Sequence, residues 1–163
     1  MSAQLSYNFA TPFGAAGGIV DLAPYEIDTY INGENTGVMG FGMGVVDGTT
    51  AGIDVKLPTA TNQTFEGITV NNRTTEYDLD GNLHIVNKAA LGVMRYGRVY
   101  VQLATSVEPT FGAPVYLVCA GDDKGKFTTS SSSTMAINAR FVSVANNGVA
   151  MVELQQPNIV DAT

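Results

Sequence analysis

The feature that most limits how this chain can fold is how often its apolar runs are interrupted. Runs of a few apolar residues alternate with Gly, Asn, Asp and Pro along most of the sequence. No window of ten or more residues places its apolar positions at a clear helical period, so helices are expected to be scarce. Short runs rich in β-branched and aromatic residues between such breaks predict β-strands. The predicted strands are 25–31, 38–46, 53–57, 65–70, 83–86, 91–95, 98–104, 115–120, 135–144 and 148–154.

This many short strands in 163 residues predict an all-β fold, either an antiparallel β-sandwich or a β-barrel. The length suits one compact domain, which we expect to occupy residues 25–163. The sequence pattern does not reveal the order of the strands in the sheet. The clearest local signal is Asn146-Asn147-Gly148, because an Asn-Gly pair tolerates the positive φ angles of a tight turn between antiparallel strands.

Residues 1–24 differ from the rest and predict an extended N-terminal arm. They are rich in Gly, Ala and aromatic residues, and they have too little periodicity for a helix or a strand. Tyr7, Phe9 and Phe13 are spaced along this segment, and aromatic side chains are unfavourable in water. Either the arm docks on a neighbouring protein or it folds back onto its own domain, and both interpretations stay open. On the first, these three aromatic residues are the candidate contacts.

The composition limits the kinds of partner. The formal net charge is −7 and the eight Lys and Arg residues are scattered, so we expect no nucleic-acid binding. Charged residues make up only 14% of the chain, which is low for a fully solvated surface and suggests that partners cover part of it. No apolar stretch approaches the roughly 18 residues of a membrane span, and the N-terminus has no signal-peptide pattern. We therefore expect neither a membrane association nor secretion by a standard signal.

Two motifs suggest ligand sites only superficially. In the run 40–44, glycine occupies every second position, which does not match the spacing of a dinucleotide loop. It predicts instead a strand with Phe41 and Met43 on one face and a bare glycine face that another backbone can approach closely. The segment 78–82 has oxygen ligands at alternate positions, but the bidentate Glu of a calcium loop is missing. A hairpin turn explains that segment better.

Catalytic residues are hard to find in this chain. The lone histidine, His84, has no local partner pattern, and a pair with Cys119 has no support beyond its being possible in space. Cys119 lies in the apolar run 115–119, where a thiol packs as a small hydrophobic group, and one cysteine cannot form an intramolecular disulfide. We expect no enzymatic activity, no catalytic residues, no cofactor and no metal site.

Four blocks of the sequence carry a resemblance to a known family. They are YNFATPFGAAGG at 7–18, VKLPTA at 55–60, FEGITVNNRTTEY at 65–77 and GVMRYGRVYV at 92–101. Together with the C-terminal hairpin, they make the chain resemble the structural cement proteins of tailed phages over nearly its whole length. The resemblance does not extend to the serine-rich loop Ser130 to Ser133, whose role stays open.

The resemblance implies a capsid decoration protein of the virion, made in the host cytoplasm and added to the outer capsid surface. It implies the major capsid protein as a partner and several clustered copies, a homotrimer by preference, although a dimer fits the same residues. Low charge, an aromatic arm and an acidic surface agree with that role. An alternative from another class is a virion surface appendage that binds host carbohydrate, although the absence of Trp weakens it.

Overall fold

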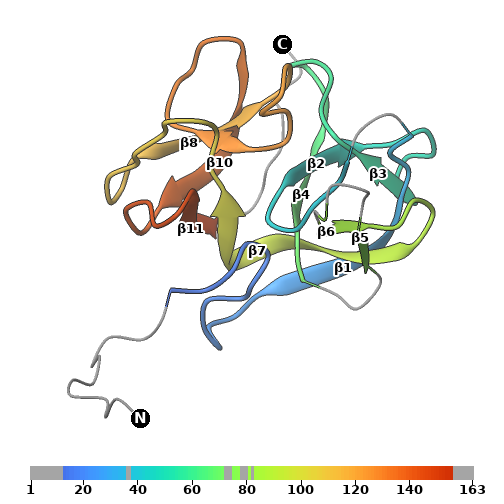
Figure 1. The fold of residues 1–163 in the computed structure, drawn as a ribbon, viewed down its shortest axis with the longest axis horizontal. Helices are drawn as coiled ribbons and strands as arrows, with labels where there is room; N and C mark the ends of the chain where they lie inside the picture. The colour runs from blue at the N-terminus through green and yellow to red at the C-terminus, as the bar shows by residue number, and fades with distance from the viewer. Residues whose placement is uncertain (1–12, 36–37, 72–74, 78–80, 82, 156–163) are drawn as a thin grey trace.

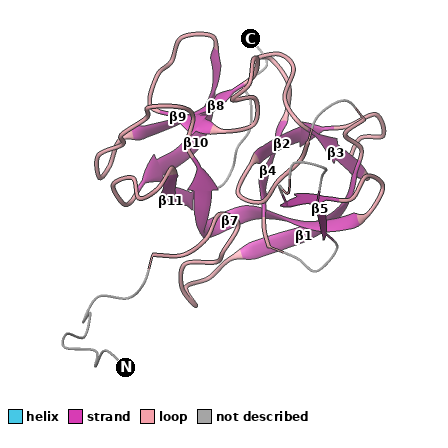
Figure 2. Cartoon of the chain, in the orientation of Figure 1, coloured by secondary structure: helices cyan, strands magenta, loops and turns pink. Residues whose placement is uncertain are grey.

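The computed structural model describes residues 13–35, 38–71, 75–77, 81 and 83–155. This part of the chain consists of strands and loops (Figure 2), and it contains no helix that could cross a membrane. The strands are β1 (Glu26–Asn32), β2 (Gly44–Asp47), β3 (Asp54–Lys56), β4 (Phe65–Thr69), β5 (Thr75–Tyr77), β6 (Leu83–Ile85), β7 (Ala90–Gln102), β8 (Pro114–Val118), β9 (Phe127–Thr128), β10 (Thr134–Phe141) and β11 (Val149–Leu154).

Five of the strands close into a β-barrel, in the order β1-β3-β2-β4-β7 with β7 paired back to β1. The β1–β3 pair is parallel and the other pairs are antiparallel. The expected all-β fold is thus confirmed, with a barrel as its central element. The small β5–β6 hairpin forms a separate two-stranded sheet.

A second sheet also contains the long strand β7. β7 pairs with β1 along its first half, up to Tyr96, and with β11 along its second half, from Gly97 onward. The sheet continues through β10, β8 and β9, and a bridge between Leu103 and Phe127 returns β9 to the end of β7. Figure 1 shows β7 running from the barrel into this second half of the molecule.

The wall shared by the two halves is buried on both faces. Val45 belongs to the hydrophobic cluster inside the barrel, whereas the next residue, Val46, belongs to the cluster under the second sheet. Val93 and Met94 of β7 divide between the two clusters in the same way. Because successive side chains of a strand point to opposite faces, continuous apolar stretches of β2 and β7 serve two cores at once.

The single strand β7 replaces two predicted strands, 91–95 and 98–104. Glu26 lies opposite Tyr96 and Ile27 opposite Met94, so Arg95 is the extra residue of a β-bulge. Gly97 follows with a φ of 117°. A bulge bends and twists a strand without ending it, which explains how one strand joins both halves.

The glycine run is only partly as predicted. Residues 40–43 form a turn, not a strand, and β2 begins at Gly44. Phe41 and Met43 are both buried in the cluster inside the barrel. The expected close approach of another backbone is confirmed at Gly42, where a Cβ atom would lie 2.8 Å from both Gly17 N and Tyr100 O. The predicted strand failed because Gly42 has a positive φ of 68°, which ends the extended conformation.

Candidate interaction surface

The arm, as far as it is described, folds back onto its own domain. Gly17 N–H donates to the Tyr100 carbonyl at 2.8 Å, Tyr100 N–H donates to the Gly18 carbonyl at 3.0 Å, and Val20 N–H donates to the Arg98 carbonyl at 3.1 Å. These residues therefore extend the second sheet along the edge of β7 that β11 leaves open. The Phe13 ring lies edge-on against Tyr100, with 5.0 Å between ring centroids.

A ladder of charges crosses the outer face of three adjacent strands. Arg98 of β7 donates from Nε to Glu153 of β11 at 2.9 Å, and Arg140 of β10 donates from Nη2 to the same carboxylate at 3.2 Å. Both contacts join residues directly opposite each other in the sheet. Burial alone would raise the pKa of Glu153, but the two guanidinium groups outweigh it and hold the pKa below its usual value.

The ladder ends at the arm. Arg98 also donates from Nη1 to Asp21 Oδ2 at 3.1 Å, and the other oxygen of Asp21 accepts the Ala23 N–H at 3.0 Å. One carboxylate thus fixes the turn that contains Leu22. The Leu22 side chain is 97% exposed, which is unusual for a large apolar residue in an ordered turn.

Two aromatic residues beside this turn extend the apolar surface. Tyr25 is 47% exposed and Tyr96 is 39% exposed. The start of β1 and the middle of β7 meet here, with Tyr25 packed against Gly97 so closely that a Cβ atom on the glycine would lie 2.7 Å from Tyr25 Cβ. We call Leu22, Tyr25 and Tyr96 the Leu22 patch.

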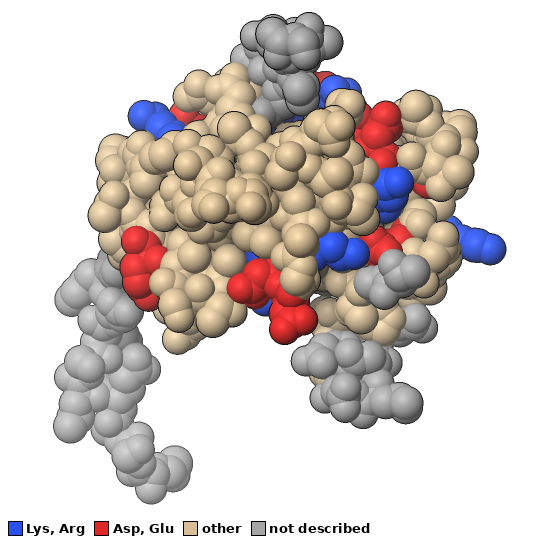
Figure 3. All heavy atoms as spheres, turned by 90° about the horizontal axis from the view of Figure 1, so that it is seen from above, with Lys and Arg blue, Asp and Glu red and all other residues tan. Residues whose placement is uncertain are grey.

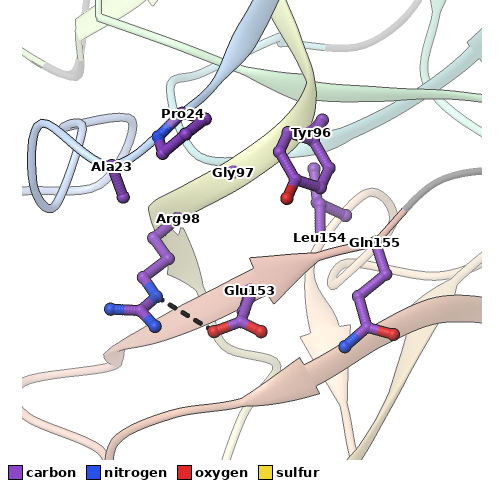
Figure 4. Close-up of a pocket in the computed structure, with 8 residues that line it drawn as sticks. All are labelled: Ala23, Pro24, Tyr96, Gly97, Arg98, Glu153, Leu154 and Gln155. Atoms are coloured by element: carbon purple, nitrogen blue, oxygen red, sulfur yellow. Dashed lines mark hydrogen bonds and ion pairs between the residues drawn. The ribbon is translucent and has the colours of Figure 1, made fainter.

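A pocket of about 370 Å³ opens next to the Leu22 patch. Figure 4 shows Ala23 and Pro24 on one side of Gly97, Tyr96 on the other, and the bonded Arg98–Glu153 pair below them. The lining is apolar on the walls and polar at one end; it consists of Ala23, Pro24, Tyr96, Gly97, Arg98, Glu153, Leu154 and Gln155. The ion pair satisfies its own charges, so the pocket is suited to an apolar side chain rather than an ion.

A further exposed aromatic residue lies at the far end of the ladder. Phe111 is 71% exposed, and the Arg140 guanidinium carbon lies 5.9 Å from its ring centroid. On the face that Figure 3 shows, charged side chains lie around the margin of a broad uncharged area.

Of the three aromatic residues predicted as contacts, Tyr7 and Phe9 lie outside the described residues. Phe13 contacts Tyr100 and stays partly exposed. Sequence reasoning missed the Leu22 patch and the ladder. The exposed register of β7, in which Tyr96 and Arg98 alternate with buried residues, is the signal that could have found part of this surface.

Among the described residues, Cys119 and His84 lie in different parts of the fold. Cys119 is buried in the core under the second sheet, its Sγ donates to the Leu117 carbonyl at 3.4 Å, and burial raises the pKa of its thiol. His84 lies on β6, in the small separate sheet. The acidic residues of the calcium-like segment, Asp78 and Asp80, lie outside the described residues. Across the part of the chain that is described, no three His, Cys, Asp or Glu residues gather as metal ligands would.

The fold resembles that of a known virus protein. A chain in the solved structure titled "The capsid of Myoviridae Phage XM1" matches with a TM-score of 0.71 and 19% sequence identity. The match covers 96% of this chain and 99% of that chain, so the two share a fold over nearly their whole lengths.

The sequence comparisons point to one family. No curated protein sequence matches this chain significantly. The family described as "Structural cement protein (E217 gp24/Pam3 gp6)" matches residues 3–155, which includes the arm, the barrel and the second sheet. This chain therefore belongs to the phage structural cement protein family.

Proposed function

We propose that this cement protein binds the outer face of a tailed-phage head and links neighbouring subunits of the major capsid protein. The family match over residues 3–155 is the observation that carries the proposal. The shared fold with a chain of the XM1 capsid supports the same location. A small protein added in many copies can stabilise a shell because many weak contacts act together.

We infer that the role is structural and involves no catalysis. Cys119 is buried and its pKa is raised, which keeps the thiol protonated and unreactive.

A protein that acts through contacts needs a surface that loses little free energy when water is removed from it. The low charge content of this chain supplies such surface.

The arm supplies the proposed anchors. We assign Tyr7, Phe9 and Phe13 to contacts with the capsid lattice. The support for this assignment is that the arm is fastened to β7 by backbone hydrogen bonds at Gly17 and Val20. A tension on the aromatic residues is thus passed directly to the strand that joins both halves of the domain.

We further propose that several copies cluster on the shell. A homotrimer suits threefold positions of a capsid lattice, and a dimer suits twofold positions. A standard interface of about 800 Å² per partner is available several times over on an accessible surface of 9379 Å².

The test is co-sedimentation of the purified protein with undecorated mature heads, with unexpanded precursor shells, and with no shell. Saturable binding to mature heads, with a rise in their resistance to heat, is the expected result. The Phe9→Ala/Phe13→Ala double variant should bind more weakly while keeping its fold. Phe111→Ala, which removes an exposed aromatic residue at the other end of the ladder from Asp21, is the matched control and should bind normally.

Two results would count against the proposal. If the protein stays in the supernatant with either shell at high concentration, the cementing role is wrong. If the double variant saturates heads as the unchanged protein does, the arm has to be removed from the mechanism while the cementing role remains.

A further inference from the structure

We propose that the Leu22 patch and its pocket form a twofold contact between two copies of this chain, in which Leu22 of each copy enters the pocket of the other. This inference goes beyond the cementing role, because it concerns the free protein and assigns the self-contact to particular residues. Four observations lead to it, namely a rigid apolar projection, an adjoining pocket of suitable size, their position on one turn, and the local balance of charge.

The projection is held in place by polar contacts. Asp21 bonds both to Arg98 of β7 and to the Ala23 N–H, so the turn between them is closed by one carboxylate. Val20 is tied to β7 by its backbone N–H. A flexible turn could fold Leu22 back onto the domain, but this one keeps the side chain 97% exposed. A leucine side chain left in water forgoes burial energy that a partner could recover.

The pocket has room for this projection and suits its chemistry. Its volume of about 370 Å³ exceeds what one isobutyl group needs, and its walls include the Pro24 and Tyr96 side chains (Figure 4). Tyr25 and Tyr96 flank the opening, and tyrosine is enriched in protein interfaces because it combines apolar area with a polar end. The Arg98–Glu153 pair closes the polar end without an unpaired charge.

The arrangement of projection and pocket favours a second copy as the occupant. Leu22 projects from the same turn whose next residues, Ala23 and Pro24, form a pocket wall. A twofold axis beside this turn brings each projection to the other copy's pocket and makes two identical contacts. Open head-to-tail filaments need the two features on separate faces, so their adjacency favours a closed assembly, of which the pair is the simplest.

The distribution of charge also favours a contact between two copies at this surface. Asp21, Arg98, Glu153 and Arg140 contribute two positive and two negative charges in mutual contact. The formal charge of −7 therefore belongs to the rest of the chain. These ion pairs leave little net charge beside the pocket, and the exposed Glu26, next to Tyr25, adds one carboxylate at its edge. Salt screens the remaining repulsion and leaves apolar contacts intact, so association should strengthen as ionic strength rises.

The experiment measures the mass of the full chain, without shells, by sedimentation equilibrium from low to high micromolar concentration and at two salt concentrations. We expect a concentration-dependent rise from one to two chain masses that is steeper in high salt. Leu22→Asp should weaken the association at least tenfold, because two carboxylates would enter apolar pockets. Tyr96→Arg should weaken it from the pocket side, whereas Leu22→Met should preserve it.

Val144→Asp is the matched control, since it places the same charge on another exposed aliphatic residue, outside the patch. Circular dichroism on each variant checks that the fold is retained. A wild-type protein that stays monomeric throughout, a mass of three chains, or an equal loss in Val144→Asp would each overturn the proposal. Co-sedimentation of Leu22→Asp with heads is scored separately, so that a failure of pairing is distinguished from a failure of cementing.

Discussion

At the scale of single residues, Gly42 controls how the arm meets the barrel. It has a positive φ of 68°, and its α-carbon faces Gly17 N and the Tyr100 carbonyl. We expect Gly42→Ala to lower the free energy of unfolding by about 2 to 4 kcal/mol, because strain and a backbone collision add. Denaturant titration measures this change.

Gly52→Ala is the control for that substitution. Gly52 has a similar φ of 74°, but a Cβ atom there would meet nothing within 4 Å. It should therefore show only the conformational penalty, about 1 kcal/mol. Equal losses in the two variants would mean that the close approach at Gly42 is unimportant.

Tyr30 should make the stability of the protein depend on pH in the alkaline range. Burial, followed by the hydrogen bond that its hydroxyl donates to Glu66 at 2.9 Å, raises its pKa to about 12. Above the ordinary tyrosine pKa of about 10, the unfolded chain ionises first, so the folded protein loses stability as pH rises from about 10 to about 12. The unfolding free energy of wild type, compared with that of Tyr30→Phe across this range, should fall by about 2 kcal/mol, whereas parallel curves would contradict the assignment.

At the scale of elements, we expect β7 to make the barrel and the second sheet one folding unit, because it belongs to both. Met94 packs under the second sheet while its neighbour Val93 packs inside the barrel. We expect Met94→Ala to destabilise the protein by about 2 to 5 kcal/mol and to speed hydrogen exchange in β1 and β11 alike. Loss of protection confined to β11 would show that the halves open independently.

The elements also show what could be predicted from the sequence. The hairpin at Asn147 was predictable because a positive φ at Asn-Gly is a local property, and Asn146 and Val149 are indeed bridged there. β5 and the two-residue β9 escaped prediction because neither lies in a run of apolar or β-branched residues such as those that mark the similarly short β3 and β6. The sequence predicted two strands in place of β7, because a glycine such as Gly97 locally indicates a break. The strand is continuous because it pairs with β1 and β11, which are distant in the sequence.

The candidate surface was harder to predict for the same reason. Arg98, Arg140 and Glu153 are scattered along the sequence, and only the order β7-β11-β10 places them in one ladder. The aromatic content of the arm was visible in the sequence. The packing of Phe13 on Tyr100 depends on an edge of β7 that no sequence pattern marks.

At the scale of the whole molecule, charge governs how copies behave together. The chain carries −7 near neutral pH and has a pI of about 4.4. Mutual repulsion should therefore vanish as pH falls towards 4.4. We expect light scattering from the free protein to rise to a maximum near that pH and to decline on either side. A flat profile would mean that charge does not limit its association.

The docking of the arm along β7 has a mechanical consequence. Its hydrogen bonds at Gly17, Gly18 and Val20 lie in a row along the strand. A pull directed along that row loads all of them simultaneously, in shear, whereas a pull across it opens them one after another like a zipper. If the arm holds the shell as proposed, a stretch of the shell parallel to β7 would pull in the first direction. The arm would then act as a tether that resists lateral stretching and can still be peeled away from above.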